Sequence, residues 1–298
     1  MEPVTVAVPR RSAVARWFTE AVPLGRVAAF RTVVYLFVVY DVLCRTPWVR
    51  ARATASTDLY RPLFVGRVLH LPTPTATLVA VVMWSLVVGG LVAATGRLPR
   101  AVGWAVAVLY FEWMVVAMSY GKVDHDRFGF LLALFVLPTV GAARHGDTRR
   151  SEAAGWALRM VQIGAVATYF LSAVAKLRFA GVRWPTSSVM AWALVRRGSD
   201  GALRLARIPN VLVVSQFVAF AAEALSPLLF VLKGRWRYGA VGACYVFHLV
   251  VVWALGISFG PHLVTLLAFL PLEVVRPVER VHRLFVRHPD GSPAVASS

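Results

Sequence analysis

The chain has 298 residues, of which 58% are hydrophobic and only 15% are charged, whereas a soluble globular domain has roughly 25% charged residues. Its formal net charge is +18, yet its 32 lysines and arginines fall mostly in short clusters between apolar runs. This distribution argues against a soluble basic stripe that binds DNA or RNA. It predicts an all-α fold, a polytopic bundle of transmembrane helices.

The apolar runs predict about eight transmembrane helices, with six to nine possible, since a span needs about 20 mostly apolar residues. The fourth and the eighth run are short. The predicted spans cover residues 25–43, 75–94, 101–119, 127–143, 156–176, 211–232, 239–257 and 259–275.

One membrane domain is the simplest organisation, with an N-terminal segment over 1–24, a transmembrane domain over 25–275 and a C-terminal tail over 276–298, disordered after Pro289. The first 20 residues contain several arginines and no apolar stretch typical of a cleavable signal peptide, so we expect the first helix to be retained. Two cysteines, Cys44 and Cys244, are expected toward opposite faces of the bilayer, without a disulfide.

The lysines and arginines of the short loops predict that both termini are cytoplasmic and that the protein lies in the cell membrane. Two longer connections, 44–74 and 177–210, are placed outside despite their arginines, because long loops weigh less in this rule. They contain aromatic residues suited to the membrane interface, and we expect short amphipathic elements there. The expected inside positions carry Arg97, Arg100, Arg144, Arg149, Arg150, Lys233, Arg235, Arg237 and the arginines of the tail.

Ionisable residues within or beside these spans are candidates for function, because each costs roughly 2.5–3.5 kcal/mol at the centre of a helix. Glu223 and His248 lie within predicted spans, and Lys176 closes the fifth. The others are expected near the outer ends of the helices. The candidate set is Asp41, Lys122, Asp124, His125, Asp126, Lys176, Glu223, His248 and His262. These groups come from at least five segments, which predicts a polar cavity in the outer half of the bundle.

Each of these residues also has a purely structural interpretation. Lys176 can extend its ammonium group to the interface, and the Asp124–Asp126 segment can be a solvated loop or a cap of the helix that follows. His248 can be a neutral histidine that is hydrogen-bonded between helices, and Glu223 can pair with Arg26 or Arg31. The sequence leaves both interpretations open.

The sequence contains no motif typical of a metal site, a hydrolase or a nucleotide-binding site. Asp124, His125 and Asp126 with His248 or His262 could bind a divalent ion, but no pair of histidines has the i, i+4 spacing of a zinc-protease helix, so no metal site is expected. The chain contains no G-x-S-x-G nucleophile motif, no phosphate-binding loop and no dinucleotide-binding glycine motif.

Three stretches in this order carry a family resemblance: KVDHDRFGFLLALFVLP, VQIGAVATYFLSAVAKLRFAGVRW, and EALSPLLF followed by CYVFHLVVVWALGI. Together they resemble the membrane domain of vitamin K-dependent gamma-carboxylase and of the bacterial horizontally transferred transmembrane (HTTM) proteins. The resemblance covers roughly residues 25–275.

The resemblance implies roles for two residues. Lys176, eight residues before Trp184, looks like the lysine that deprotonates the vitamin K hydroquinone, and His125 looks like a histidine of the same site. A lysine shielded from water can act as a base, and a histidine beside carboxylates can shuttle protons. The chain ends where the carboxylase continues into its substrate-binding domain, and it has Ala175–Lys176 where the carboxylase has paired lysines.

We therefore expect a membrane enzyme that performs acid–base chemistry on a lipid-soluble isoprenoid-type substrate. The leading expectation is a terpene cyclase, in which Asp124 or Asp126 would protonate the chain and aromatic side chains would stabilise carbocations. In a carboxylase-like enzyme, Lys176 would be the base and a reduced quinone the cofactor; no other cofactor is expected. The third alternative is a non-catalytic transporter or maturation factor, although no inverted repeat is visible. The expected substrate-binding residues are Asp41, Trp113, Phe128, Tyr169, Phe170, Trp184 and His262, around catalytic Asp124, His125, Asp126, Lys176, Glu223 and His248.

Overall fold

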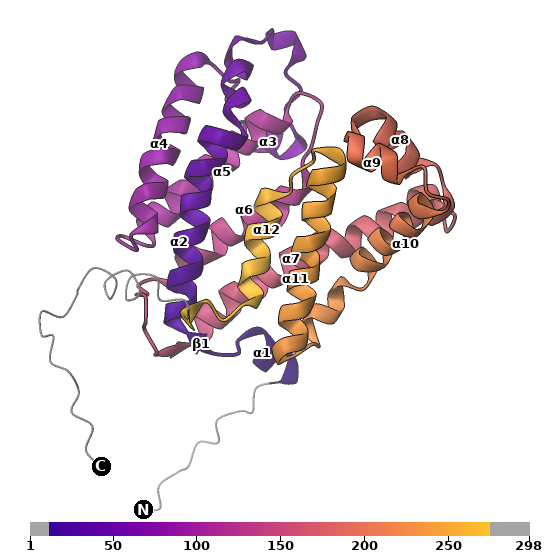
Figure 1. Cartoon of the computed structure of the whole chain (residues 1–298). Helices are drawn as coiled ribbons and strands as arrows, with labels where there is room; N and C mark the ends of the chain where they lie inside the picture. Colours follow the sequence, from indigo (N-terminus) through magenta and orange to yellow (C-terminus); the bar gives the residue numbers. More distant parts are fainter. Residues whose placement is uncertain (1–11, 275–298) are drawn as a thin grey trace, which may run out of the picture.

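The computed structural model describes residues 12–274 of the chain, and helices account for nearly all of its regular structure (Figure 1). The prediction of an all-α transmembrane bundle is confirmed. Residues 1–11 of the predicted N-terminal segment over 1–24 and the whole predicted tail over 276–298 lie outside the described residues.

The described α-helices are α1 Ala13–Phe18, α2 Leu24–Tyr40, α3 Phe64–Val68, α4 Ala76–Ala94, α5 Ala101–Met118, α6 Phe128–Val136, α7 Glu152–Ala180, α8 Val189–Arg197, α9 Asp200–Leu205, α10 Val211–Ala224, α11 Gly234–Leu255 and α12 Gly260–Leu266. A π-helix, Asp41–Arg45, continues α2. The 3₁₀ helices are Pro47–Thr54, Thr57–Leu59, His125–Arg127, Leu137–Val140, Trp184–Thr186, Ser226–Phe230, Leu267–Phe269 and Leu272–Val274. The strands β1 Val22–Pro23 and β2 Arg150–Ser151 pair antiparallel, Val22 opposite Ser151.

Within the described residues, five helices are long and apolar enough to cross a membrane: α2 with its π-helical extension, α4, α5, α7 and α11. Their outward faces remain apolar. On α4, for example, Val81, Trp84 and Val88 are each more than half exposed. Only 11% of the most apolar stretch of α11 is buried. Large exposed apolar faces of this kind are typical of contact with lipid, so the protein is a multi-pass membrane protein.

The other three predicted spans are helical but shorter than predicted, and each reaches a proline. A proline cannot donate the hydrogen bond that continues an α-helix. After α6 the chain passes into the 3₁₀ turn that contains Pro138, and after α10 into the one that contains Pro227. The last apolar run, α12 with its 3₁₀ extension, ends at Phe269 before Pro271. Glu223 is therefore in the last turn of α10 and not in the middle of a span.

The helices pack around two hydrophobic cores (Figure 1). The larger core lies between α2, α4, α5, α6 and the first half of α7, and includes Phe30, Tyr35, Trp113 and Phe130. The smaller core joins the second half of α7 to α11 and α12 through Tyr169 and Phe269. Helix α7, at 29 residues, belongs to both cores. It therefore connects the two halves of the bundle.

Two glycines set the distance between α6 and α7. A Cβ on Gly164 would lie 3.1 Å from the Cα of Gly129, and a Cβ on Gly129 would lie 3.3 Å from the backbone of α7. The two backbones are therefore nearly in contact, as in transmembrane helix pairs with small residues at the crossing.

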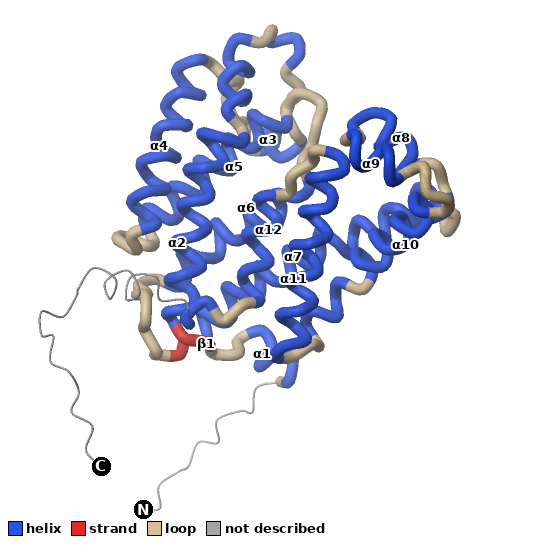
Figure 2. Tube along the Cα trace, in the orientation of Figure 1, coloured by secondary structure: helices blue, strands red, loops and turns tan. Residues whose placement is uncertain are grey.

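We call the end of the bundle at which β1 and β2 pair the strand end, and the opposite end, formed by 41–74, 119–127 and 177–210, the loop end (Figures 1 and 2). The expected short elements in the two long connections are present at the loop end, as 3₁₀ helices and α3, α8 and α9.

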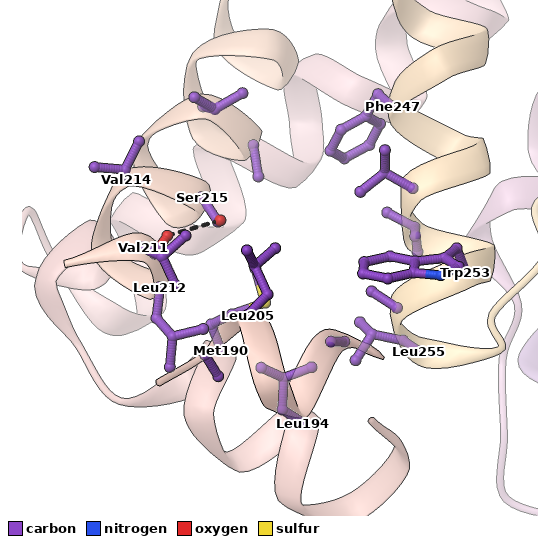
Figure 3. Close-up of a pocket in the computed structure, with 17 residues that line it drawn as sticks. Met190, Leu194, Leu205, Val211, Leu212, Val214, Ser215, Phe247, Trp253 and Leu255 are labelled. Carbon is purple, nitrogen blue, oxygen red and sulfur yellow. Dashed lines mark hydrogen bonds between the residues drawn. The ribbon is translucent and has the colours of Figure 1, made fainter. Parts of the chain in front are cut away.

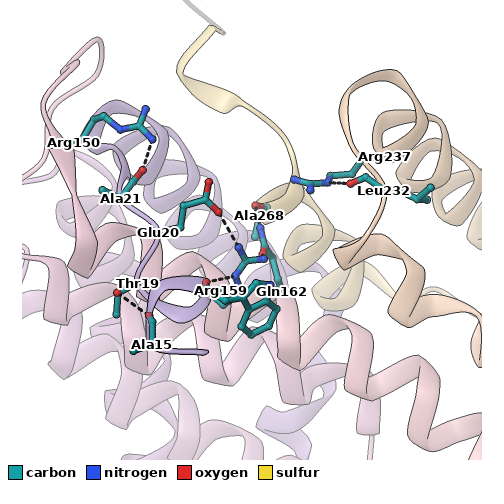
Figure 4. Close-up of polar contacts among 11 residues, drawn as sticks. Ala15, Thr19, Glu20, Ala21, Arg150, Arg159, Gln162, Leu232, Arg237 and Ala268 are labelled. Carbon is teal, nitrogen blue, oxygen red and sulfur yellow. Dashed lines mark hydrogen bonds and ion pairs between the residues drawn. The ribbon is translucent and has the colours of Figure 1, made fainter. Parts of the chain in front are cut away.

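At the strand end, α1 is fixed to α7 by Arg159 (Figure 4). The guanidinium donates to the Trp17 carbonyl, to Glu20 and to Gln162, and it lies 4.4 Å from the centre of the Trp17 ring. Gln162 in turn donates to the carbonyl of Ala268 at 2.8 Å. One arginine and one glutamine thus join α1, α7 and the 3₁₀ turn after α12.

Candidate functional site

A cavity of about 210 Å³ lies toward the loop end, where α7, α10, α11, α12 and the turn before α6 meet. It contains most of the ionisable residues that the sequence singled out. It is lined by His125, Thr168, Tyr169, Ser172, Lys176, Glu223, Phe247, His248, Val251, Phe259 and His262. The predicted convergence of polar groups from five segments is therefore present in the structure, although it does not include every residue expected there.

An ion pair between Lys176 on α7 and Glu223 on α10 forms one wall of this cavity. The lysine Nζ lies 2.7 Å from Oε1 and 2.5 Å from Oε2 of the glutamate. Nζ also donates to the hydroxyl of Ser172, one turn earlier on α7, at 2.7 Å. Both side chains are largely shielded, with 20% and 13% of their surfaces exposed. The sequence-based alternative that Glu223 pairs with Arg26 or Arg31 is wrong, since Arg26 pairs with Glu273 and Arg31 donates to backbone carbonyls.

Two histidines line the same cavity, together with Tyr169. The Tyr169 hydroxyl and Nε2 of His248 share a hydrogen bond of 2.7 Å. His262 packs edge-on against the Tyr169 ring at 4.4 Å, and its two ring nitrogens have no hydrogen-bond partner among the described residues. Nδ1 of His248 is likewise unpaired there. Buried polar atoms are nearly always hydrogen-bonded, so these three nitrogens are available to water or to a ligand.

Trp184, expected to bind substrate, lies beside Lys176 with its ring centre 5.0 Å from Nζ, but it does not line the polar cavity. Its position depends on Gln216, a fully buried amide within the apolar run of α10. The Gln216 amide donates to the carbonyls of Trp184, Pro185 and Ser187, and its oxygen accepts from the Met190 N–H. The sequence prediction missed Gln216, and its only signal was an uncharged amide in an apolar helix.

Two further cavities adjoin this site. One, of about 240 Å³, lies between α8, α9, α10 and α11, and its walls are almost entirely apolar (Figure 3). It shares Phe247 and Val251 with the polar cavity. The other, of about 450 Å³, shares His125, Thr168 and Ser172 with the polar cavity and reaches the exposed side chains of Phe128 and Leu171. The polar site therefore lies between an apolar chamber and a lipid-facing opening.

The two aspartates beside His125 do not line the polar cavity. Asp124 pairs with Lys122 at 2.8 Å. Asp126 is buried, and burial raises the pKa of its carboxyl above the usual range. Asp124 precedes the 3₁₀ turn, but its side chain does not cap it. The loop thus supplies His125 to the cavity, while its aspartates face elsewhere.

Asp41 and Trp113 belong to a separate polar cluster in the larger core, not to the substrate-binding surface expected for them. Asp41, fully buried at the start of the π-helix, accepts from Arg127 at 2.7 Å and from the Tyr110 hydroxyl at 2.8 Å. Burial alone would lower the pKa of Arg127, but Tyr110 and Asp41 raise it above the usual value. The Trp113 indole donates to Thr46 at 2.9 Å. The π-helical turn thus places Asp41 inside the helix bundle, against Arg127.

The remaining sequence-predicted residues are placed as follows. Phe128 lines the lipid-facing opening, whereas Phe170 lies on α7 with 41% of its surface exposed and lines none of these three cavities. Ser172 was not predicted, although it stands four residues before Lys176 and hence on the same helix face. Among residues 12–274, no three histidine, cysteine, aspartate or glutamate side chains lie close enough together to hold a metal ion.

No model of a known protein family, no curated protein and no solved structure matches this chain.

Proposed function

We propose that the protein is an integral membrane enzyme that transfers a proton to or from a lipid-soluble, isoprenoid-type substrate. The observation that carries the proposal is the Lys176–Glu223 pair in a shielded cavity that also contains three histidines and adjoins an apolar chamber. General acids and bases act from side chains within hydrogen-bond reach of the reacting group.

The pair supplies both halves of acid–base chemistry. A substrate hydroxyl that enters beside Lys176 can give its proton to the Glu223 carboxylate, while the ammonium group stabilises the oxyanion that forms. The unpaired nitrogens of His248 and His262 are suited to hold a second polar group of the substrate. His125, at the lipid-facing opening, is suited to exchange protons with the outside.

The neighbouring cavities support a substrate with a polar head and a long apolar chain. The chain would occupy the chamber between α8 and α11, and the substrate would enter from the bilayer past Phe128 and Leu171. The resemblance to the membrane domain of the vitamin K-dependent carboxylase and the HTTM proteins supports an isoprenoid chain and, for base chemistry at the Lys176–Glu223 pair, a reduced quinone.

Proton-initiated cyclisation of a terpene is the second candidate. The aromatic rings of Tyr169, Phe247 and Phe259 in the cavity wall favour it, since such rings stabilise carbocations. The proton donors first expected for it, Asp124 and Asp126, do not line the cavity. For this reason we place first the proton transfer to Glu223 that Lys176 assists.

We further propose that the protein lies in the cell membrane with both termini in the cytoplasm. The positively charged loops expected inside meet at the strand end, where the described chain also begins and ends (Figure 1). Arg150 at this end donates to the carbonyl of Ala21, and Arg237 donates to that of Leu232 (Figure 4). Clusters of lysine and arginine mark cytoplasmic loops.

The test uses the full chain in lipid nanodiscs, incubated with a prenylated quinol or with geranylgeranyl-bearing lipids, and mass spectrometry of the products. We expect Lys176→Met and Glu223→Gln each to lower turnover by about 100-fold or more. Lys122→Met, at an exposed lysine of the loop end, is the matched control. If Lys176→Met and Glu223→Gln turn over the substrate as fast as the control does, Lys176 and Glu223 take no part in the chemistry. Binding without any product would favour the transporter alternative.

A further inference from the structure

A second polar cavity, of about 500 Å³, lies at the strand end, far from the proposed active site. It is formed by α2, by the end of α4 with the turn after it, and by the loop between α6 and β2. Its lining consists of Ala28, Arg31, Thr32, Ala94, Thr95, Gly96, Arg97, Ala142, Ala143, Arg144 and His145. None of these described residues is acidic.

Arg31 forms the inner wall of this cavity and is 1% exposed. Only one of its three nitrogens is paired within the described residues: Nη2 donates to the carbonyls of Leu137 at 3.2 Å and Gly141 at 2.9 Å. Its Nε and Nη1 have no partner there. Its acceptors are neutral, so its charge is compensated by no described carboxylate. A buried charge without a counter-charge is costly, and an anion in the cavity would supply one.

The outer wall adds further positive charge and hydrogen-bond donors. Arg97 and Arg144 are exposed at the mouth, and His145 lies beside them, sharing a hydrogen bond of 3.1 Å with the Thr32 hydroxyl. The acidic residue of the same loop, Asp147, is already paired with Arg149 at 2.7 Å. Three guanidinium groups at different depths therefore surround one space.

We infer that this cavity binds the phosphate group of an anionic ligand. Arginine forms paired, charge-assisted hydrogen bonds with phosphate oxygens, and a cavity of this size is within the range of ligand sites. A basic cavity between transmembrane helices at the cytoplasmic surface suits the headgroup of an anionic phospholipid. The same chemistry would accept free phosphate, so the source of the phosphate group is left to the experiment.

The experiment measures the thermal unfolding of the full-length protein under paired conditions. In detergent, inorganic phosphate is titrated against potassium chloride at equal ionic strength. In nanodiscs, phosphatidylglycerol is compared with phosphatidylcholine, and native mass spectrometry identifies the retained lipid. The test variant is Arg97→Gln with Arg144→Gln, both at exposed positions. The control is Arg50→Gln with Arg67→Gln, which removes two exposed charges at the loop end.

We expect phosphate, phosphatidylglycerol or both to stabilise the wild type and the control. We expect the test variant to bind the same ligand at least about tenfold more weakly. Stabilisation by phosphatidylglycerol alone identifies a lipid site, and stabilisation by phosphate identifies a site that is open to soluble anions. The inference is overturned if neither ligand stabilises more than its paired condition, or if the test variant binds as the wild type does.

Discussion

Lys176 and Glu223, 47 positions apart in the chain, form an ion pair between α7 and α10, with both carboxylate oxygens within 2.7 Å of the ammonium nitrogen. Since the Ser172 hydroxyl also accepts from the lysine, the pair is fixed from two helices at once. This pair is central to the proposed chemistry, and it joins α7 to α10.

The pair predicts a strong coupling between its two positions. Either Lys176→Met or Glu223→Gln alone leaves one partly buried charge unpaired, whereas the double variant removes both charges. We expect each single variant to be less stable than the double variant, with a coupling energy of about 1–3 kcal/mol. Unfolding in detergent micelles, followed by circular dichroism, measures it, and additive single effects would contradict the prediction.

Gln216 predicts a local effect. Gln216→Leu keeps the approximate size of the side chain but removes the amide that bonds to the carbonyls of Pro185 and Ser187 and to the Met190 N–H. The Trp184 carbonyl keeps its bonds from Ser187. We expect the free energy of unfolding to fall by at least about 1–3 kcal/mol, because a buried polar group that is left unpaired costs that much. Hydrogen exchange should increase over residues 184–190, and Trp184 fluorescence should shift to longer wavelength. Ser215→Ala, at the residue before Gln216 on α10, is the control. An equal change in hydrogen exchange in this control would assign the effect to the helix as a whole.

The Asp41 cluster predicts a graded series. Asp41→Asn removes the ion-pair partner of the buried Arg127 guanidinium and should cost about 3–5 kcal/mol. Tyr110→Phe removes one hydroxyl that hydrogen-bonds to both groups, and should cost about 1 kcal/mol. The measurement is the free energy of unfolding of each variant. If the tyrosine variant were the less stable of the two, the ion pair would not be the dominant interaction.

Asp126 predicts a pH dependence of stability. Burial raises the pKa of its carboxyl in the folded protein, so the folded state holds this proton more tightly than the unfolded state does. The stabilising effect of the proton is complete below the unfolded pKa and is lost as the pH rises through the folded value. Asp126→Asn should therefore raise the melting temperature at pH 7 and have little effect near pH 3.5. An equal change in melting temperature at both pH values would be inconsistent with this assignment.

The sequence was sufficient for the fold class, because each apolar run is a helix in the structure. The positions at which the α-helices end were harder to predict from the sequence. Hydropathy continues through Leu137–Val140 and Ser226–Phe230, yet prolines convert both stretches to 3₁₀ turns. A count of apolar residues does not register the lost backbone hydrogen bond.

The members of the site were predictable only in part, and their pairings were not. Lys176, Glu223 and His248 stood out because charge is costly in a membrane, and the three line one cavity. Asp41 stood out for the same reason, but its partner Arg127 is 86 positions away and stabilises a different cluster. Which charge meets which depends on the angles at which helices cross, and a single sequence does not contain these angles.

The near-contact of Gly129 with Gly164 sets the distance between α6 and α7 through backbone atoms and not through the side chains that line the cavity. His125, three residues before α6 begins, lines the same cavity as Ser172 and Lys176 of α7, and the close packing of the α6 and α7 backbones at these glycines brings the two elements together. The distance between α6 and α7 therefore does not depend on the side chain at position 125. A change at 172 or 176, in contrast, also removes a hydrogen bond to Glu223 on α10, so redesign of the site can begin at position 125.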